Sequence, residues 1–420
     1  MHESISDPGA GSLSFLNEAM VRYPDAISFA PGAPHPEFFD ELDLEAAIES
    51  FVGHLVQNRG ITAGQARKLL YEYGPSRGLI SDIVARVLEE DEGISADPKS
   101  IVITVGAQEG LFLVLRLLFA SSSTMLAVTN PCYSGILGAA RVLGIPLVPI
   151  PESDDGIDTG QLADRCTAAR RMGTPIRALY IAPDFGNPGG SRMPMSARQE
   201  LLRLATRFDF LVIEDNAYGF TANDDDVIPC LKALDVEQRV VHIGTYSKTC
   251  FPGARVGYVL ADQTVDAGPQ RLADEISTLK GLVTVNTSPI SQAVIGGTLL
   301  ARLAGDGSHR AATRRRAERY QRNLQCLTRE LNRRLGGMHD IRWNHPAGGF
   351  FVRLSLPVLA DAALLDVSAT RYRVLWTPMA PFYLDASGDR QLRLSCSYLD
   401  TEQIVVGVER LATFLAEEVL

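Results

Sequence analysis

The chain has 420 residues, of which 46% are hydrophobic, and its 40 Lys and Arg against 50 Asp and Glu give a formal net charge of -10. This length exceeds what one hydrophobic core usually fills, so we expect two domains, and the acidic balance argues against nucleic acid as a partner. The sequence has no apolar run long enough for a membrane, no signal-peptide pattern at its start and six scattered cysteines, which together predict a cytoplasmic protein without a metal site.

Strand-like and helix-like segments alternate along the chain from about residue 75. An apolar-striped helix is expected over residues 108–119, between two of the strands. The expected strands are residues 101–105, 125–129, 178–182, 211–213, 240–243 and 256–260. This alternation predicts an α/β fold with a mostly parallel sheet.

The pattern changes after residue 305. Residues 308–335 are arginine-rich and predict a long helix, and we expect Arg314, Arg315 and Arg316 to lie on its solvated face. Further on, residues 348–354 and 391–395 alternate like strands of a smaller domain that a helix over 401–418 closes. We expect an N-terminal arm with part of the small domain over 1–45, a large domain over 46–305 and a C-terminal small domain over 306–420.

The most informative segment surrounds Lys248, which follows a buried strand. Thr245 and Ser247 precede this lysine, and Arg255 follows it by seven positions. A lysine at a strand end can form a Schiff base with the aldehyde of pyridoxal 5'-phosphate (PLP), while neighbouring hydroxyl groups and an arginine hold the phosphate. The segment therefore predicts a PLP site.

A second motif, which is acidic, follows the expected strand over residues 211–213. A carboxylate beside the pyridine nitrogen of PLP keeps that nitrogen protonated, and Asp215 is the candidate for this role. Tyr218, three residues later, is the candidate partner of the phenolic oxygen of PLP. An isolated Asp at a strand end is more often a helix cap or turn residue. The presence of Lys248 one strand further along favours the cofactor interpretation.

Three further strand ends carry candidate cofactor contacts. Asn187, in a Gly- and Pro-rich turn, can donate to the ring oxygen of PLP, although the turn alone has an ordinary structural explanation. The backbone amides of Gly106, Ala107 and Gln108 open a helix and can bind a phosphate. Tyr133 follows another strand and can stack on the pyridine ring, or can equally be a core tyrosine.

Arg393 is the candidate for binding the substrate. It lies in an expected strand of the small domain, and its planar guanidinium matches a carboxylate with two parallel hydrogen bonds. The alternation with Leu392 and Leu394 is also compatible with an arginine on the surface of the strand.

Taken together, these motifs resemble the class I/II aminotransferases of PLP fold type I over nearly the whole chain. The resemblance is greatest to the branch of 2-aminoadipate and kynurenine aminotransferases and of aminotransferase-like domains in certain regulators. It implies an aspartate aminotransferase-like fold, with a seven-stranded sheet in the large domain and a smaller α+β domain. It also implies a homodimer with shared active sites, in which Tyr73 reaches the phosphate in the partner, residues 287–289 lie at the interface and Gly32 lies near the substrate α-carboxylate.

Two positions depart from the pattern of that family. Its usual Asn-Pro-Thr-Gly is Asn187-Pro188-Gly189-Gly190 here, a loss of one hydroxyl group. Asp184 is often neutral in relatives, and an extra acid beside the cavity would favour a substrate with a cationic side chain unless it only caps a turn. Residues 15–22 and 35–39 are expected to shape the pocket for the substrate side chain.

The resemblance implies a ping-pong transamination between an amino acid and a 2-oxo acid. Lys248 would serve as general base at the substrate Cα. Because one PLP scaffold supports several reactions, a β-lyase, a decarboxylase or an oxygen-using enzyme is the main alternative. A PLP-binding sensor without turnover is a further one.

Overall fold

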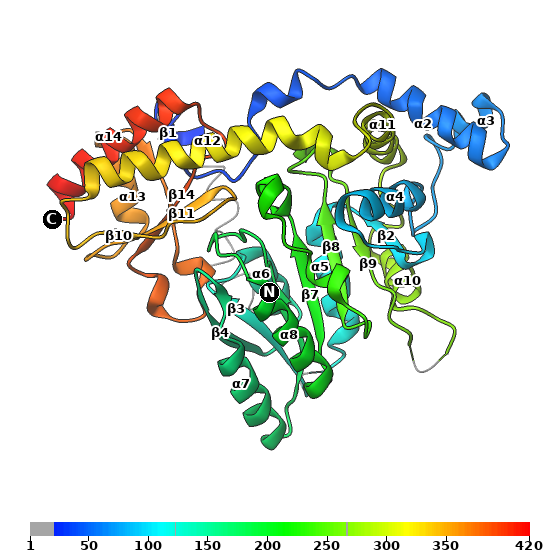
Figure 1. Ribbon diagram of the computed structural model, residues 1–420, viewed down its shortest axis with the longest axis horizontal. Helices are drawn as coiled ribbons and strands as arrows, with labels where there is room; N and C mark the ends of the chain where they lie inside the picture. Colours follow the sequence, from blue (N-terminus) through cyan, green and yellow to red (C-terminus); the bar gives the residue numbers. More distant parts are fainter. Residues whose placement is uncertain (1–20, 122, 266–267) are drawn as a thin grey trace.

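A computed structural model describes residues 21–121, 123–265 and 268–420 of the chain (Figure 1). Within these residues the larger of two main sheets has eight strands. In spatial order they are β2 (Ile101–Thr104), β9 (Gly257–Leu260), β8 (Val240–Thr245), β7 (Leu211–Asn216), β6 (Ile176–Ile181), β3 (Met125–Asn130), β4 (Leu147–Ser153) and β5 (Gly156–Ile157).

The central strands of this sheet are parallel, as the sequence predicts. β3, β4, β6, β7 and β8 run in one direction, and β9 is antiparallel to both of its neighbours. The sheet has one strand more than the expected seven because the two-residue β5 folds back antiparallel along β4. The α/β class and the mostly parallel sheet are confirmed.

Helices cover both faces of the large sheet, and the central strands are therefore buried on both sides. Along β7, Val212 packs into one hydrophobic cluster and its neighbour Ile213 into another. The cluster around Ile213 contains α5 (Gly106–Leu118), α6 (Ser134–Val142) and α10 (Leu272–Val283). The cluster around Val212 contains α7 (Thr159–Arg171), α8 (Met195–Phe208) and α9 (Leu231–Leu234).

A third cluster lies at the β2 and β9 edge of the sheet. It contains α2 (Leu44–Arg59), α3 (Ala63–Lys68), α4 (Ser81–Glu92) and α11 (Pro289–Asp306). The sequence sets the ends of α2 locally: the Asp43 side chain accepts a hydrogen bond from the amide of Ala46, and Gly60 ends the helix with a φ of 64°. None of the described helices is long and apolar enough to cross a membrane.

The smaller sheet has its own hydrophobic core. Its antiparallel strands are β10 (Arg342–Trp343), β11 (Phe351–Ser355), β14 (Gln391–Ser395) and β13 (Thr377–Pro378), and α12 (His309–Leu335), α13 (Ala362–Arg371) and α14 (Thr401–Glu418) pack with them. From the N-terminal arm, β1 (Ile27–Ser28) pairs with β12 (Val374–Leu375), and Phe29 joins this core. Part of the arm thus packs with the small sheet, while the division into domains, with boundaries at residues 45 and 305, stays a prediction.

The long helix α12 connects the two parts of the molecule. In Figure 1 it runs in yellow from the neighbourhood of α11 to the small sheet. Arg314 and Arg315 are exposed on it as expected, but Arg316 is only 3% exposed. Arg316 donates hydrogen bonds to the carbonyl oxygens of Thr249 (2.5 Å), Cys250 (2.8 Å) and Phe38 (3.3 Å). The expectation of a solvated face is therefore wrong for Arg316, because three backbone acceptors satisfy its guanidinium in the interior.

Candidate functional site

The candidate site lies where neighbouring parallel strands of the large sheet end. Asn187 follows β6, Asp215 lies near the end of β7, and Lys248 follows β8. Because the carboxyl ends of parallel strands meet at one edge, the topology brings these three side chains to the same place. In open α/β sheets this edge is where ligands bind.

Lys248 is half-buried, and its surroundings favour the neutral amine. Its Nζ donates a hydrogen bond to the carbonyl oxygen of Gly32 at 2.6 Å, so the N-terminal arm passes directly over it. Burial, together with the positive charges of Arg255 and Arg393, lowers the pKa of Lys248 to about 8. A lysine with such a pKa has far more neutral, nucleophilic amine at neutral pH than an exposed one.

Asp215 has two carboxylate oxygens in different situations. Oδ2 accepts a hydrogen bond of 2.7 Å from the hydroxyl of Tyr180, whereas Oδ1 is buried and has no hydrogen-bond partner among the described residues. Burial raises the pKa of Asp215, and the Tyr180 hydrogen bond and the charges of His242 and Lys248 oppose that increase. Because an unpaired buried carboxylate oxygen is costly, it marks a position where a donor from a ligand fits.

A cradle suited to an anion forms at the start of α5. Gly106 has a φ of 69°, and a Cβ atom at this position would lie only 2.5 Å from Nη2 of Arg255. Nη1 of the same guanidinium donates to Oγ of Ser247 at 3.4 Å, and Oγ1 of Thr245 accepts from the amide of Ser247 at 3.1 Å. The amides of Ala107 and Gln108 belong to the first turn of the helix, where backbone N–H groups attract anions.

Arg393 is deeply buried, which excludes the surface alternative left open by the sequence. It donates to the carbonyl oxygen of Ala30 at 2.8 Å and to Oγ1 of Thr377 at 3.1 Å, and it also binds the side-chain oxygen of Asn187. Phe351 and Phe382 contact its guanidinium, with centroid distances of 4.4 Å and 5.3 Å. Burial lowers the pKa of Arg393 to about 10, so the group stays charged at neutral pH.

Two of the predicted tyrosines lie within the same site. Tyr133 precedes α6 beside Gln108, whose amide donates to the carbonyl oxygen of Gly135 at 2.8 Å. Burial and the charge of Asp215 raise the pKa of Tyr133 to about 12. Tyr218 packs edge-on against Phe350 and Phe351, with ring centroids 5.1 Å and 5.6 Å apart.

Tyr73 lies apart from the interior groups as a surface residue. It is 88% exposed, and Tyr71 beside it is 80% exposed. The next residue, Gly74, lies close to Asn286 and to Pro289, the first residue of α11. Leu282, Val283, Val285 and Ile290, which are close in sequence to Asn286 and Pro289, are also exposed.

The two departures from the family pattern have local explanations. Asp184 forms ion pairs with Arg198 at 2.6 Å and with Arg192 at 3.3 Å, so the suggestion that it selects a cationic substrate is not supported. A side chain at Gly189 would meet Oε2 of Glu152 at 2.5 Å, and the other oxygen of Glu152 accepts a 2.7 Å hydrogen bond from Ser191. The carboxyl of Glu152 thus fills the space that a larger residue 189 would need.

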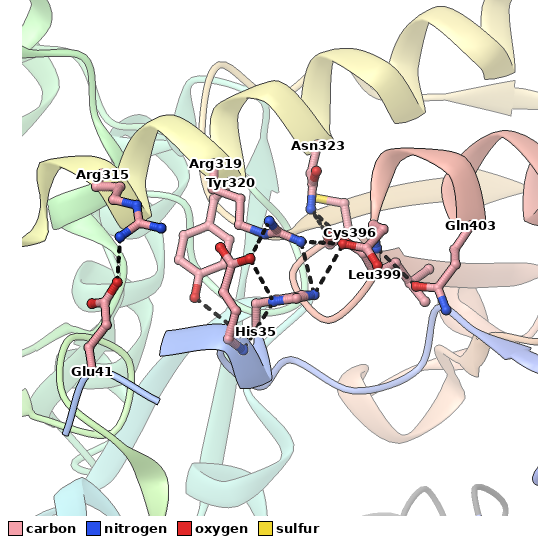
Figure 2. A network of polar contacts seen from close by, with 11 residues as sticks. His35, Glu41, Arg315, Arg319, Tyr320, Asn323, Cys396, Leu399 and Gln403 are labelled. Carbon is pink, nitrogen blue, oxygen red and sulfur yellow. Dashed lines mark hydrogen bonds and ion pairs between the residues drawn. The ribbon is translucent and has the colours of Figure 1, made fainter. Parts of the chain in front are cut away.

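A polar network fixes the arm beside the site (Figure 2). His35 receives a 2.9 Å hydrogen bond from Arg319 of α12, and its backbone amide donates to the hydroxyl of Tyr320 at 3.4 Å. Arg315 pairs with Glu41 at 2.6 Å further along the arm. Residues 15–22 and 35–39 are expected to shape the pocket for the substrate side chain. Of these, residues 15–20 lie outside the described residues.

Glu214, Cys230 and His242 form the group of described residues whose ligand atoms are close enough for a metal ion. Sequence spacing gave no sign of it, because the three positions are far apart. Glu214 already accepts hydrogen bonds from the amides of Leu231 (2.6 Å) and Lys232 (3.0 Å) and from His242 (2.8 Å). These contacts explain how the carboxylate is satisfied in the interior without a metal.

Comparison with known proteins identifies the family. Residues 44–411 match the family described as aminotransferase class I and II. The chain belongs to this family. It is a PLP-dependent aminotransferase of fold type I, and the family, fold class, enzyme class and cofactor expected from the sequence are confirmed.

Relatives match this aminotransferase along almost its entire length. It is 44% identical over 415 residues to the (S)-3,5-dihydroxyphenylglycine transaminase of Amycolatopsis orientalis, with 99% of this chain and 93% of the relative covered. It is 30% identical to the 2-aminoadipate transaminase of Thermus thermophilus, with coverage of 97% and 95%. Among solved structures, an archaeal alanine:glyoxylate aminotransferase matches with a TM-score of 0.83 at 26% identity, covering 98% of this chain and 96% of that chain. The kynurenine aminotransferase of Pyrococcus horikoshii matches with a TM-score of 0.80, also at 26% identity, with coverage of 97% and 94%.

The residues present in this aminotransferase fit PLP. The Gly106 and Arg255 cradle suits the phosphate, and the free Oδ1 of Asp215 suits a protonated ring nitrogen. Lys248 supplies an amine of lowered pKa. Tyr180 and Glu152 are two site residues that the sequence analysis did not single out.

Proposed function

We propose that this aminotransferase acts on an amino acid whose aromatic ring is bonded directly to Cα, an arylglycine, and exchanges its amino group with a 2-oxo acid in a ping-pong reaction. The observation that carries the proposal is the 44% identity, over 99% of the chain, to a transaminase named for (S)-3,5-dihydroxyphenylglycine. Other relatives, at 30% identity or less, carry names with different substrates, so their support is weaker.

The chemistry of an arylglycine favours transamination over β-elimination. Its β-carbon is part of an aromatic ring, so it carries no leaving group that a β-lyase could eliminate. The ring also stabilises negative charge at Cα, which lowers the barrier for the proton transfer that transamination requires. The β-lyase alternative therefore has no role for this substrate class.

Each residue of the site has a proposed role. Bound PLP supplies the electron sink for the reaction. Lys248 holds the cofactor and then moves the proton at the substrate Cα, for which its pKa of about 8 is suitable. Asp215 holds the ring nitrogen, and Arg393 binds the substrate carboxylate. The remaining proposed contacts are Tyr133, Asn187 and Tyr218 for the ring, Gly106, Ala107, Gln108, Thr245, Ser247 and Arg255 for the phosphate, and Gly32 and Asn187 for the substrate.

The dimer and the cellular location also belong to the proposal. The exposed Tyr73, two positions from the exposed Tyr71, is suited to a surface that a second copy of the chain covers. In such a dimer Tyr73 would complete the phosphate site of the partner. Tyr73→Phe should then weaken PLP binding without changing the oligomeric state, as measured by cofactor titration and light scattering. We also propose that the enzyme is cytoplasmic.

The decisive experiment is a half-reaction. The purified holoenzyme is mixed with single amino acids, without any 2-oxo acid, and the absorbance of lysine-bound PLP is followed. Arylglycines should convert the cofactor to its amine form much faster than 2-aminoadipate, lysine or phenylalanine. A preference for 2-aminoadipate would overturn the substrate class and keep the aminotransferase. Lys248→Ala is the control, because it should bind PLP without any conversion.

A further inference from the structure

Tyr180 donates a hydrogen bond to Asp215, the proposed partner of the ring nitrogen of PLP. It is 2% exposed and belongs to β6, the strand next to β7. In the sheet register Tyr180 is opposite Ile213, and the side chain of Asp215, two residues further along β7, lies on the same face. This geometry lets the Tyr180 hydroxyl donate to Oδ2 of Asp215 at 2.7 Å.

This hydrogen bond makes the two oxygens of the Asp215 carboxylate different from each other. Oδ2 is occupied by Tyr180, and Oδ1 has no partner among the described residues. A carboxylate held through one oxygen has little freedom to rotate, so its other oxygen keeps a fixed direction. A ligand donor can then bind without first paying for ordering of the side chain.

Tyr180 also acts on the charge of Asp215. Burial raises the pKa of this carboxyl, which favours the neutral form that cannot pair with a protonated ring. The Tyr180 hydrogen bond is the largest influence in the opposite direction, ahead of the charge of His242. The pKa of Tyr180 itself lies well above its usual value because of burial and the charge of Asp215, so its hydroxyl keeps its proton at neutral pH and can donate it to the hydrogen bond.

We propose that Tyr180 is a positioning residue for the transamination, which aims Asp215 and keeps it ionised so that Oδ1 can hold the protonated ring nitrogen of PLP. Its effect passes through Asp215, and it contacts neither substrate nor cofactor in this role. The competing explanation is that Tyr180 only fills the core beside Ala178 and Ile213. The two explanations differ in what the hydroxyl group does, because the ring fills the core in either case.

The test removes the hydroxyl and leaves the ring. In Tyr180→Phe, Asp215 loses a hydrogen bond to a charged acceptor, which is worth about 10- to 100-fold in a binding or rate constant. We expect kcat to fall by this factor with little change in KM, and the affinity of the apoenzyme for PLP to fall. The ring nitrogen should lose part of its protonation, observed by NMR of holoenzyme carrying PLP labelled with the heavy nitrogen isotope. An unchanged nitrogen signal would overturn the proposal.

A matched control and a second background separate positioning from folding. Tyr246 is also buried, but its hydroxyl has no hydrogen-bond partner among the described residues, so Tyr246→Phe should leave the nitrogen signal unchanged. In an Asp215→Asn background, Tyr180→Phe should have no further effect on PLP affinity or on the nitrogen signal. A full additional loss in that background would show that Tyr180 acts independently of Asp215 and would refute the proposal, even if the single variant is poorly stable.

Discussion

The carbonyl oxygen of Gly32 accepts a hydrogen bond from Nζ of Lys248 at 2.6 Å, and the Cα of the same glycine lies against the ring of Phe351. The arm is therefore held between the lysine and a buried phenylalanine of the small domain. A residue with a side chain has no room at this position, since a Cβ would lie 2.7 Å from Cζ of Phe351.

Gly32→Ala should accordingly displace the arm from Lys248. Overpacking of this kind costs about 1–3 kcal/mol, and we expect a lower unfolding temperature together with a reduced kcat/KM. Gly53→Ala is the control, because a Cβ there meets nothing within 4 Å and alanine favours its helix. Wild-type kinetics in Gly32→Ala would mean that the arm position does not matter for turnover. Thermal unfolding and steady-state kinetics provide the two measurements.

The lowered pKa of Lys248 predicts how cofactor uptake depends on pH. Only the neutral amine captures PLP, so the rate of covalent capture by apoenzyme should rise with pH and level off above about pH 8, not near the ordinary lysine value of 10.5. Arg393→Met removes a positive charge and should move the midpoint to higher pH, whereas Arg393→Lys keeps the charge and should move it less. Borohydride trapping followed by mass spectrometry measures the capture. Identical midpoints in the two variants would contradict this electrostatic account.

The contact between Glu152 and Gly189 predicts a coupling between two substitutions. Gly189→Ala places a Cβ 2.5 Å from Oε2 of Glu152, so the carboxyl must shift and the fold should lose about 1 kcal/mol, the lower end of the usual cost of overpacking. Combined with Glu152→Ala the clash disappears, and the double variant should be more stable than the sum of the single effects predicts. Urea unfolding of the four proteins completes the cycle. Simple additivity would show that the two residues do not compete for space.

Glu152 also predicts a pH dependence of stability. Burial raises the pKa of its carboxyl to about 7 from an ordinary 4.5, so between these values the folded state binds a proton that the unfolded state has lost. The stability contribution of Glu152 is therefore complete below pH 4.5 and is lost as the pH rises through 7. Glu152→Gln cannot ionise and should gain stability relative to wild type as the pH increases over this window. Parallel stability curves for the two proteins would refute the raised pKa.

Much of the site could be predicted because its residues stand at strand ends. Asn187, Asp215 and Lys248 each follow an apolar run, and the order of parallel strands then brings them together. Tyr180 could not be found in this way. It lies inside a buried strand, where the sequence predicts that a tyrosine only packs in the core. Its hydrogen-bond partner depends on the register between β6 and β7.

Other features escaped prediction for different reasons. β4, which carries Glu152, contains Pro149 and Pro151, and prolines weaken the strand signal. The burial of Arg316 depends on carbonyl groups from two distant segments, which no pattern along α12 reveals. The partners of Arg393 likewise come from the arm and from β13.

The guanidinium of Arg316 joins the backbone of Thr249, the residue after Lys248, to Phe38 of the arm and to a helix that spans both parts of the molecule. One side chain thus links three segments that are distant in the sequence. A displacement of α12 would therefore move the turn that carries Lys248 and the arm at the same time. The position of the reactive amine and the position of the arm over it are thus coupled through one side chain.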